Sequence, residues 1–154
     1  MRLIATTAQD TEALGGRLAR AIPRAHPQAL QVQLHGDLGA GKTTLARGFL
    51  RALGYHDVVR SPTYTLVETY DFGALTVVHA DLYRLQDPDE FEALGLRDLS
   101  TAGHVWLIEW PQRAGQGLPA ADLHITLAAE ASCHTVELQA ATPAGVQWLA
   151  HGMS

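Results

Sequence analysis

The stretch HGDLGAGKTT, residues 35–44, constrains the fold of this chain more than any other feature. Residues 36–43 match the pattern G-x-x-x-x-G-K-[ST] at every defined position. Glycines let the backbone curl so that successive N–H groups point at phosphate oxygens, and a helix beginning near Thr43 directs its positive end toward the same anion. The motif predicts a nucleotide phosphate loop between a strand and a helix. Its spacing is not G-x-G-x-x-G, which disfavours a dinucleotide fold.

We expect the loop and one later threonine to bind the nucleotide. Lys42 is the only lysine in the chain, and its compact charge suits the outer phosphates better than the broad, planar fork of an arginine. The Thr43 hydroxyl is a candidate ligand of Mg²⁺. The predicted nucleotide-binding residues are Gly36, Asp37, Leu38, Gly39, Ala40, Gly41, Lys42, Thr43, Thr44 and Thr63.

ATP is favoured over GTP as the nucleotide. Guanine-specific proteins with this loop usually carry an Asn-Lys-x-Asp element. The chain has no asparagine and no second lysine, so that element is absent.

Two carboxylates end apolar runs and are candidates for holding Mg²⁺ or positioning water. Asp81 ends TVVHAD, and Glu109 ends VWLIE. With Lys42, they form the predicted catalytic set, and Thr43 and Glu109 form the predicted metal site. His79 points to the same side of its strand as Asp81. A metal pair is conceivable there, but a hydrogen-bonded core histidine is the favoured interpretation.

Three further features have two readings each. Thr63, in SPTYT, either senses the outer phosphate as mobile switch loops do or belongs to a proline-containing turn before a strand. Arg84 and Arg97 are candidate phosphate neutralisers, although a solvated arginine is the default. Trp106 and Trp110 are expected in the core or half-buried, and Trp110 has the alternative of shaping the site.

The hydrophobic pattern predicts an α/β, P-loop NTPase-like fold of three layers, within one domain spanning residues 1–154. Antiparallel hairpins extend the parallel core of a mixed sheet. A first helix is expected over 10–22 with Asp10 or Thr11 as its N-cap, and a second over 43–53 with Gly54 as its C-cap. A third helix is expected from Asp87 onward with Pro88 in its first turn, and a closing helical turn at 144–150. Strands are expected over 29–35 and 104–110, and hairpins over 63–70 with 74–83 and 121–128 with 133–140.

Composition excludes several classes of function. The formal net charge of −5 disfavours a surface that holds nucleic acid or an anionic membrane unaided. A single cysteine leaves no disulfide framework and no cysteine-based zinc site. No apolar run is long enough to span a bilayer, and the first ten residues lack the apolar segment of a signal peptide. We therefore expect a cytoplasmic protein.

Four elements occur in order along the chain: GDLGAGKTT, SPTYTLVE, HADLYRL and LIEWP. Together they resemble the TsaE (YjeE) family of small bacterial P-loop ATPases, over about residues 11–137. The resemblance implies binding and hydrolysis of ATP during synthesis of threonylcarbamoyladenosine on tRNAs that read ANN codons. The implied partners are TsaD and TsaB, which act after TsaC has made the threonylcarbamoyl-adenylate. The family does not itself transfer the threonylcarbamoyl group.

The resemblance also implies roles for single residues. Residues 38–43 match the family's ATP cradle, Thr43 and Glu109 its Mg²⁺ positions, and Asp81 an acid important for hydrolysis. Thr63 matches a switch-like loop, and Trp110 follows the metal-site glutamate as in the family pattern. One departure is the last hairpin. Relatives often carry Gly-Arg near the nucleotide where this chain has Cys133-His134, so no nucleotide contact is assigned to this histidine.

Two other functions stay open on sequence alone. A small-molecule kinase of shikimate-kinase-like size would need an acceptor pocket and an arginine-bearing lid, and the chain shows no arginine cluster. A nucleotide-gated binding module with negligible hydrolysis has the same motifs as a slow ATPase. The acidic charge fits an accessory ATPase that meets tRNA only through its partners.

Overall fold

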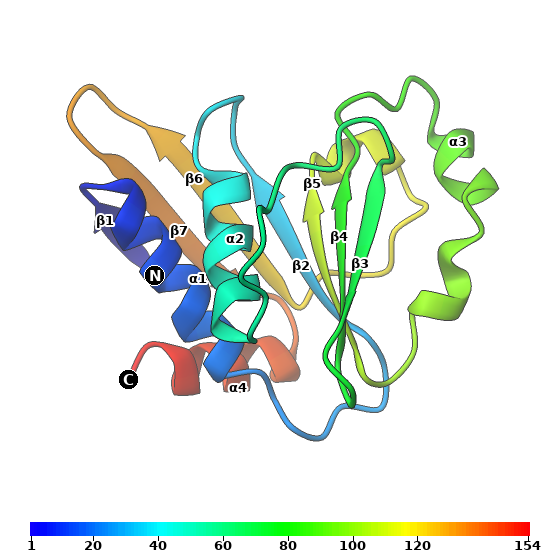
Figure 1. Ribbon diagram of the computed structural model, residues 1–154, viewed down its shortest axis with the longest axis horizontal. Helices are drawn as coiled ribbons and strands as arrows, with labels where there is room; N and C mark the ends of the chain where they lie inside the picture. The colour runs from blue at the N-terminus through cyan, green and yellow to red at the C-terminus, as the bar shows by residue number, and fades with distance from the viewer.

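A seven-stranded mixed sheet organises the protein, and its strand order is β1-β7-β6-β2-β5-β4-β3 (Figure 1). The computed structural model describes residues 1–154. The strands are β1 (Arg2–Ala5), β2 (Leu30–His35), β3 (Val67–Asp71), β4 (Thr76–Asp81), β5 (His104–Glu109), β6 (Leu123–Ala129) and β7 (His134–Ala140).

The predicted parallel core with added hairpins is confirmed. Strands β6, β2, β5 and β4 run parallel in the middle of the sheet. Each hairpin gives one strand to this core and places the other antiparallel outside it, β3 on β4 and β7 on β6. Strand β1 was not predicted. It pairs antiparallel with β7, and four residues are too few to show a hydrophobic period.

Three helices and two 3₁₀ turns lie between strands, and a fourth helix follows the last strand. They are α1 (Ala8–Arg20), α2 (Lys42–Ala52), α3 (Pro88–Ala93), η1 (Leu96–Leu99), η2 (Pro111–Ala114) and α4 (Pro143–Gly152). The predicted caps of the third helix are confirmed, because the Asp87 side chain accepts a hydrogen bond from Asp89 N and Pro88 is the first helical residue.

Some predicted boundaries were wrong. Helix α1 is capped by Thr7, not by Asp10 or Thr11, because Thr7 and Asp10 form a reciprocal capping box one turn earlier. The C-cap of α2 is Leu53, and Gly54 follows it with a left-handed φ of 108°. Strand β3 begins only at Val67, because the preceding residues turn. The closing turn is a ten-residue helix.

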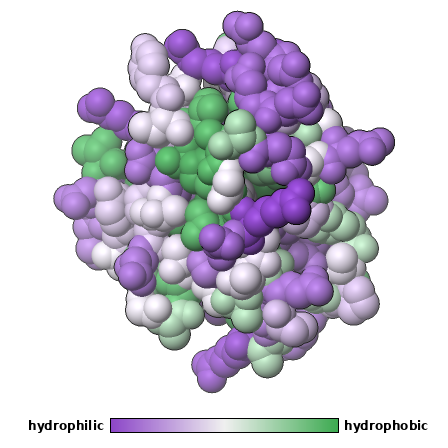
Figure 2. Space-filling view, turned by 90° about the vertical axis from the view of Figure 1, so that its right-hand side faces the viewer, coloured by the Kyte–Doolittle hydropathy of each residue, from purple (hydrophilic) through white to green (hydrophobic).

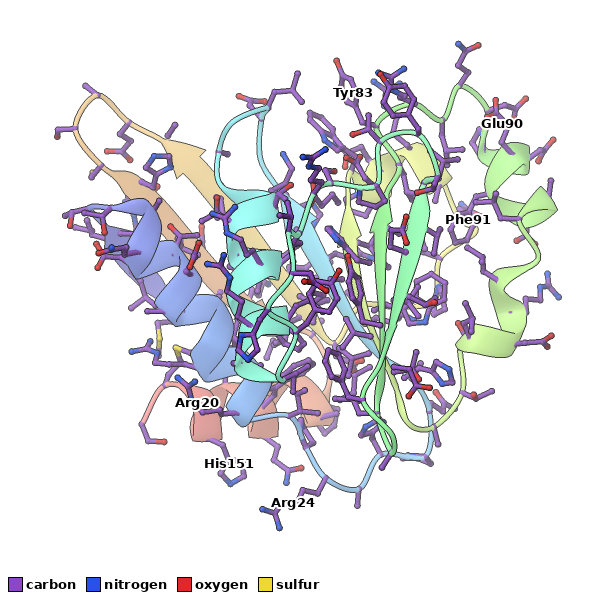
Figure 3. The ribbon with its side chains drawn as sticks, in the orientation of Figure 1. Arg20, Arg24, Tyr83, Glu90, Phe91 and His151 are labelled. Carbon is purple, nitrogen blue, oxygen red and sulfur yellow. The ribbon has the colours of Figure 1, made fainter.

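The helices form layers on the two faces of the sheet. Side chains of α1, α2 and α4 share one large core with the sheet, centred on Phe49, Leu34 and Trp148. A smaller core on the other face joins Phe91 of α3 to Trp106 and other side chains of β4 and β5. Figure 3 shows Phe91 pointing from α3 toward the sheet. None of the helices has the length and apolar character that crossing a membrane requires.

The side of the molecule that carries α3 and β3 is largely hydrophilic. Figure 2 shows this side, where apolar side chains gather in a recess near the middle and hydrophilic ones surround them. The smaller core is covered in part by two short elements, α3 and η1.

A close approach of α1 and α2 fixes the helix that follows the phosphate loop. A Cβ added to Gly48 would lie 2.0 Å from the carbonyl oxygen of Glu12, so no larger residue fits without a shift of the backbone. The Glu12 carboxylate also accepts hydrogen bonds from Arg47 Nε at 2.6 Å and Arg51 Nη1 at 3.0 Å. These contacts set the position of the first turn of α2, which carries the predicted site residues.

Candidate functional site

The phosphate loop lies at the edge of the sheet where the parallel strands β2, β4 and β5 end (Figure 1). It leaves β2 at Gly36, whose φ is 144°. A Cβ at this position would lie 2.3 Å from Leu127 O of β6, so glycine is required for both backbone angle and space. Gly41 is the N-cap of α2 and has no side-chain cap, which leaves the first N–H groups of the helix free for an anion.

Lys42 is folded over its own loop. It is 5% exposed, and its Nζ donates hydrogen bonds to Gly36 O at 2.5 Å and Asp37 O at 2.9 Å. The same ammonium lies 4.5 Å from the centroid of the Trp110 ring. Backbone carbonyls and an aromatic face therefore hold the lysine charge within reach of the loop's concave side.

One carboxylate oxygen connects the loop to the neighbouring strand. Thr43 Oγ1 donates a hydrogen bond to Glu109 Oε1 at 3.0 Å, and His79 Nε2 lies 2.9 Å from the same oxygen. Glu109 is 3% exposed and His79 is fully buried. The structure thus shows a hydrogen-bonded buried histidine, the favoured interpretation of the sequence. Its Nδ1 has no hydrogen-bond partner.

Asp81 lies beside Glu109 because the two residues are register partners on the parallel strands β4 and β5. Its Oδ2 accepts a hydrogen bond from the Ser61 hydroxyl, and its Oδ1 accepts one from Tyr83 N at 3.0 Å. Asp81 is 6% exposed. These bonds orient the carboxylate from both ends and connect it to the loop before β3.

Three carboxylates act on the charge of the loop lysine. Burial lowers the pKa of Lys42 below its ordinary value, and the carboxylates of Glu109, Asp81 and Asp37 partly oppose this by favouring the ammonium. The charges of the site are thus coupled to one another.

The predicted switch residue Thr63 lies at the edge of the site. Its Oγ1 donates to Ser61 O at 3.3 Å, and residues 63–65 form a turn before β3. The Tyr64 side chain is 86% exposed, and the Arg84 guanidinium lies 4.6 Å from its ring centroid. The turn is therefore attached to the site by few contacts.

A pocket of about 320 Å³ brings most of the predicted residues together. Its lining contains the predicted Leu38, Gly39, Gly41, Lys42, Thr43, Thr44, Thr63, Asp81 and Glu109, together with Ser61, Tyr83, Arg84 and Trp110. Gly36, Asp37 and Ala40 are outside the lining. The first two hold Lys42 through their carbonyl groups, and Ala40 is buried.

Sequence reasoning missed two residues of this pocket, Ser61 and Tyr83. The Tyr83 ring lies 4.9 Å from the Trp110 ring, and Figure 3 shows Tyr83 at the end of the molecule where the phosphate loop lies. Both residues are within the SPTYT and HADLYRL segments, so the segments themselves were the signal. Trp110 is half-buried with a left-handed φ of 57°, which turns the chain away directly after Glu109.

The structure also places two residues whose roles the sequence left open, and it confirms the default interpretation of Arg97 as a solvated arginine, because its side chain is 89% exposed. Arg97 is not a neighbour of the phosphate loop, because it pairs with Glu92 at a different cavity. His134 Nδ1 lies 3.1 Å from Ala40 O, so this histidine contacts the backbone of the phosphate loop. The strand pairing of β7 with β6 brings it there, and no local pattern announces it.

The donor set at the pocket suits Mg²⁺ more than a transition metal. No group of three or more histidine, cysteine, aspartate or glutamate side chains is placed to hold a metal ion by itself. Magnesium typically keeps several waters and takes one or two protein oxygens together with substrate phosphates. The Thr43 hydroxyl and the Glu109 carboxylate, adjacent to the phosphate loop, match that requirement.

The chain matches a described protein family over most of its length. The model of the family "Threonylcarbamoyl adenosine biosynthesis protein TsaE" matches residues 5–136. The protein from Haemophilus influenzae named tRNA threonylcarbamoyladenosine biosynthesis protein TsaE is 44% identical over 133 residues, which cover 85% of this chain and 84% of the relative. The protein of that name from Treponema pallidum is 35% identical over 127 residues, covering 82% and 90%.

A solved structure gives the same result for the fold. The crystal structure of YdiB from Bacillus subtilis superposes with a TM-score of 0.76 at 26% identity, covering 99% of this chain and 93% of that chain. The likeness therefore includes the sheet edges as well as the phosphate loop.

Proposed function

This chain belongs to the TsaE family of threonylcarbamoyl adenosine biosynthesis proteins, and from that premise we propose that it is the pathway's Mg²⁺-dependent ATPase. The observation that carries the proposal is the hydrogen bond between Thr43 Oγ1 and Glu109 Oε1, with Asp81 in register beside it. This arrangement joins a phosphate loop to two carboxylates at one pocket. The curated relatives' shared name supports a role in tRNA threonylcarbamoyladenosine synthesis.

ATP or ADP would bind along the loop from Gly36 to Thr44. Backbone N–H groups and the start of α2 would face the phosphates, and Lys42 would exchange its carbonyl partners for the outer phosphate oxygens. The absence of any asparagine supports ATP over GTP.

Mg²⁺ would be held by Thr43 and Glu109, and it would supply charge stabilisation at the outer phosphates. His79 fixes the Glu109 carboxylate by a hydrogen bond to Oε1, which leaves Oε2 for the ion or its water shell. Asp81 would accept a hydrogen bond from the attacking water. Its contacts with Ser61 and Tyr83 hold it in place for that task.

Hydrolysis by the isolated chain is expected to be slow. Arg84 is the one arginine in the pocket lining, and its guanidinium lies over the Tyr64 ring. In phosphoryl transfer, an arginine that stabilises the charge of the transition state can raise the rate by orders of magnitude. Such a residue would have to be repositioned or supplied by a partner.

TsaD and TsaB are the proposed partners, and tRNA would be met only through their complex in the cytoplasm. Leu38 lines the pocket and Tyr64 lies against the lining residue Arg84, and they are 68% and 86% exposed, which suits a surface that another protein covers. Thr63 lines the pocket and precedes Tyr64 in the chain, so the state of a bound nucleotide would alter the surface presented to a partner.

Reconstitution tests the proposal. Purified TsaC, TsaD and TsaB, tRNA, threonine, bicarbonate and ATP should form threonylcarbamoyladenosine over repeated cycles only when this chain is present. The Lys42→Ala variant serves as the inactive control. Unchanged product formation without this chain would contradict the proposed role.

Two rival functions remain testable alongside it. A small-molecule kinase would transfer phosphate to an acceptor rather than to water. A nucleotide-gated binding module would bind partners in response to ATP without releasing phosphate. Neither is favoured by the relatives' names.

A further inference from the structure

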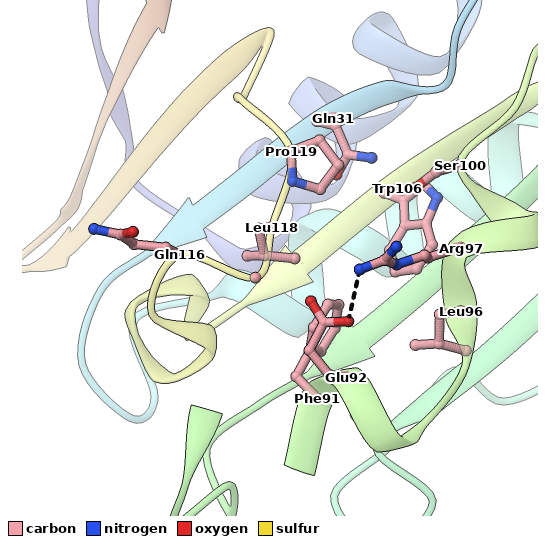
Figure 4. A pocket seen from close by; sticks show the side chains of 11 residues that line it. Gln31, Phe91, Glu92, Leu96, Arg97, Ser100, Trp106, Gln116, Leu118 and Pro119 are labelled. Atoms are coloured by element: carbon pink, nitrogen blue, oxygen red, sulfur yellow. Dashed lines mark hydrogen bonds and ion pairs between the residues drawn. The ribbon is translucent and has the colours of Figure 1, made fainter. Parts of the chain in front are cut away.

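A second cavity, of about 330 Å³, lies on the face of the sheet covered by α3 and η1 (Figure 4). Gln31 of β2 and Trp106 of β5 line it from the sheet, and Phe91, Leu96 and Leu118 line it from the covering elements. It shares no lining residue with the nucleotide pocket. Its volume lies at the lower end of the range for small-molecule sites.

The side chain of Gln31 is the unexplained group of this cavity. The residue is 2% exposed, and its Oε1 is buried without a hydrogen-bond partner. Its backbone is satisfied, because Gln31 N donates to Asp122 Oδ2 and Asp122 N donates to Gln31 O. Figure 4 shows its amide nitrogen directed into the cavity, toward Trp106. A buried carbonyl oxygen without a partner is costly, and native proteins rarely keep one unless water or a ligand completes it.

The walls indicate what the amide would meet. Trp106 is the register partner of Gln31, so both side chains lie on the same face of the sheet. The indole Nε1 already donates to Leu99 O at 2.7 Å, which leaves only an apolar ring surface for an occupant. Phe91 and Leu118 add further apolar surface. The cavity therefore combines one amide with an aromatic and aliphatic lining.

The rim carries no net charge for an ionic ligand. Arg97 Nη2 lies 3.2 Å from Glu92 Oε2, and Figure 4 draws this ion pair at the cavity. Both charges are thus paired with each other. Because the two rim charges are paired and the Gln31 amide is uncharged, we expect a neutral molecule to occupy the cavity.

We propose that this cavity binds a small neutral aromatic carboxamide or lactam. The N–H and C=O of such a ligand would pair with the carbonyl and amino groups of the Gln31 side chain. Its ring would lie against Trp106 and Phe91. This site is separate from the nucleotide pocket, so the inference does not depend on ATP binding.

Benzamide is the probe, and N,N-dimethylbenzamide, which has no N–H, is its matched control. In ¹⁵N–¹H spectra of the full chain, benzamide should shift the Trp106 indole N–H and the Gln31 side-chain NH₂ signals. We expect a Kd of about 1 mM, in the range of small fragments, and at least tenfold weaker binding of the dimethyl compound. Saturating ADP with Mg²⁺ should leave the benzamide affinity unchanged.

Two variants locate the binding. Gln31→Leu should weaken benzamide binding at least tenfold, whereas Gln33→Leu, on the same face of β2 but outside the cavity, should not. Leu96→Trp should fill the cavity and abolish binding even if Gln31→Leu fails to fold. Equal affinity for the two amides, or no shift of the Trp106 and Gln31 signals up to the solubility limit, would overturn the proposal. So would a crystal structure in which only an ordered water satisfies Gln31 and benzamide does not displace it.

Discussion

Thr43 Oγ1 and His79 Nε2 share one acceptor, the Oε1 atom of Glu109, at 3.0 Å and 2.9 Å. The phosphate loop and a fully buried histidine of β4 thus hold the same carboxylate oxygen from two sides. On the proposed function, the Thr43 hydroxyl and the Glu109 carboxylate would both hold Mg²⁺, and the contact with His79 would orient the carboxylate. His79 is therefore a positioning residue for the Glu109 carboxylate.

Removing the histidine contact should weaken the metal site. His79→Leu should raise the Mg²⁺ concentration needed for half-maximal ATP binding about 10- to 100-fold, because outer-shell hydrogen bonds orient metal ligands. His79→Gln, whose amide can donate near the position of Nε2, should recover much of the loss. Calorimetric titration of ATP at varied Mg²⁺ measures this. Equal Mg²⁺ dependence in both variants and the wild type would show that Glu109 needs no such support.

Lys42→Arg should reduce nucleotide affinity about tenfold or more although the charge is kept. The lysine is 5% exposed, donates to two loop carbonyls and lies against Trp110, so a planar guanidinium has no room for the same geometry. Arg51→Lys, an exchange at a half-exposed ion pair on the same helix, is the matched control. ADP binding measured by calorimetry should separate the two variants, and an unaffected Lys42→Arg would refute the explanation of the lone lysine.

His35 should make the fold less stable in mild acid. Burial and the nearby His124 lower the pKa of His35 below the 6.5 of the free side chain. The unfolded chain then binds more protons than the folded chain as the pH falls below about 6.5. The contribution of His35 to the free energy of unfolding is therefore complete above that pH and declines below it. The wild-type Tm should fall more steeply between pH 7.5 and 5.5 than that of His35→Gln. Parallel curves would contradict the assignment.

Gly48→Ala should destabilise the packing of α1 on α2. The added Cβ would meet Glu12 O at 2.0 Å, and overpacking of this kind costs about 1–3 kcal/mol. At this chain length the Tm should fall about 2–4 °C for each kcal/mol. Gly16→Ala is the control, because the nearest atom to its added Cβ is a flexible Arg20 side-chain nitrogen at 3.4 Å. It should be neutral or stabilising, and equal loss in both variants would mean that helix packing is not the cause.

The sequence predicted the sheet and the loop well because their signals are local. The motif, the apolar runs ending at Asp81 and Glu109, and the turn residues of both hairpins each lie within about ten residues. Boundaries were less accurate where side chains compete for a cap, as Thr7 does with Asp10.

Contacts across the sheet could not be predicted in the same way. The approach of His134 to Ala40 O depends on strand pairing between residues that are 94 positions apart. The place of Arg97 depends on how α3 and η1 fold against the sheet, and there it pairs with Glu92 at the second cavity, away from the phosphate loop. The Gln31 Oε1 atom without a hydrogen-bond partner can be recognised only in the folded structure, where the covering elements bury it.

The proposed ATPase activity can be measured as phosphate release from ATP at saturating Mg²⁺. It should be measured for the wild type, Glu109→Gln and Asp81→Asn, each alone and with TsaD and TsaB. We expect slow phosphate release by the wild type alone and faster release with both partners. Each variant should be slower by orders of magnitude while folding normally by circular dichroism. Fast release unaffected by the partners, or full activity in both folded variants, would contradict the account.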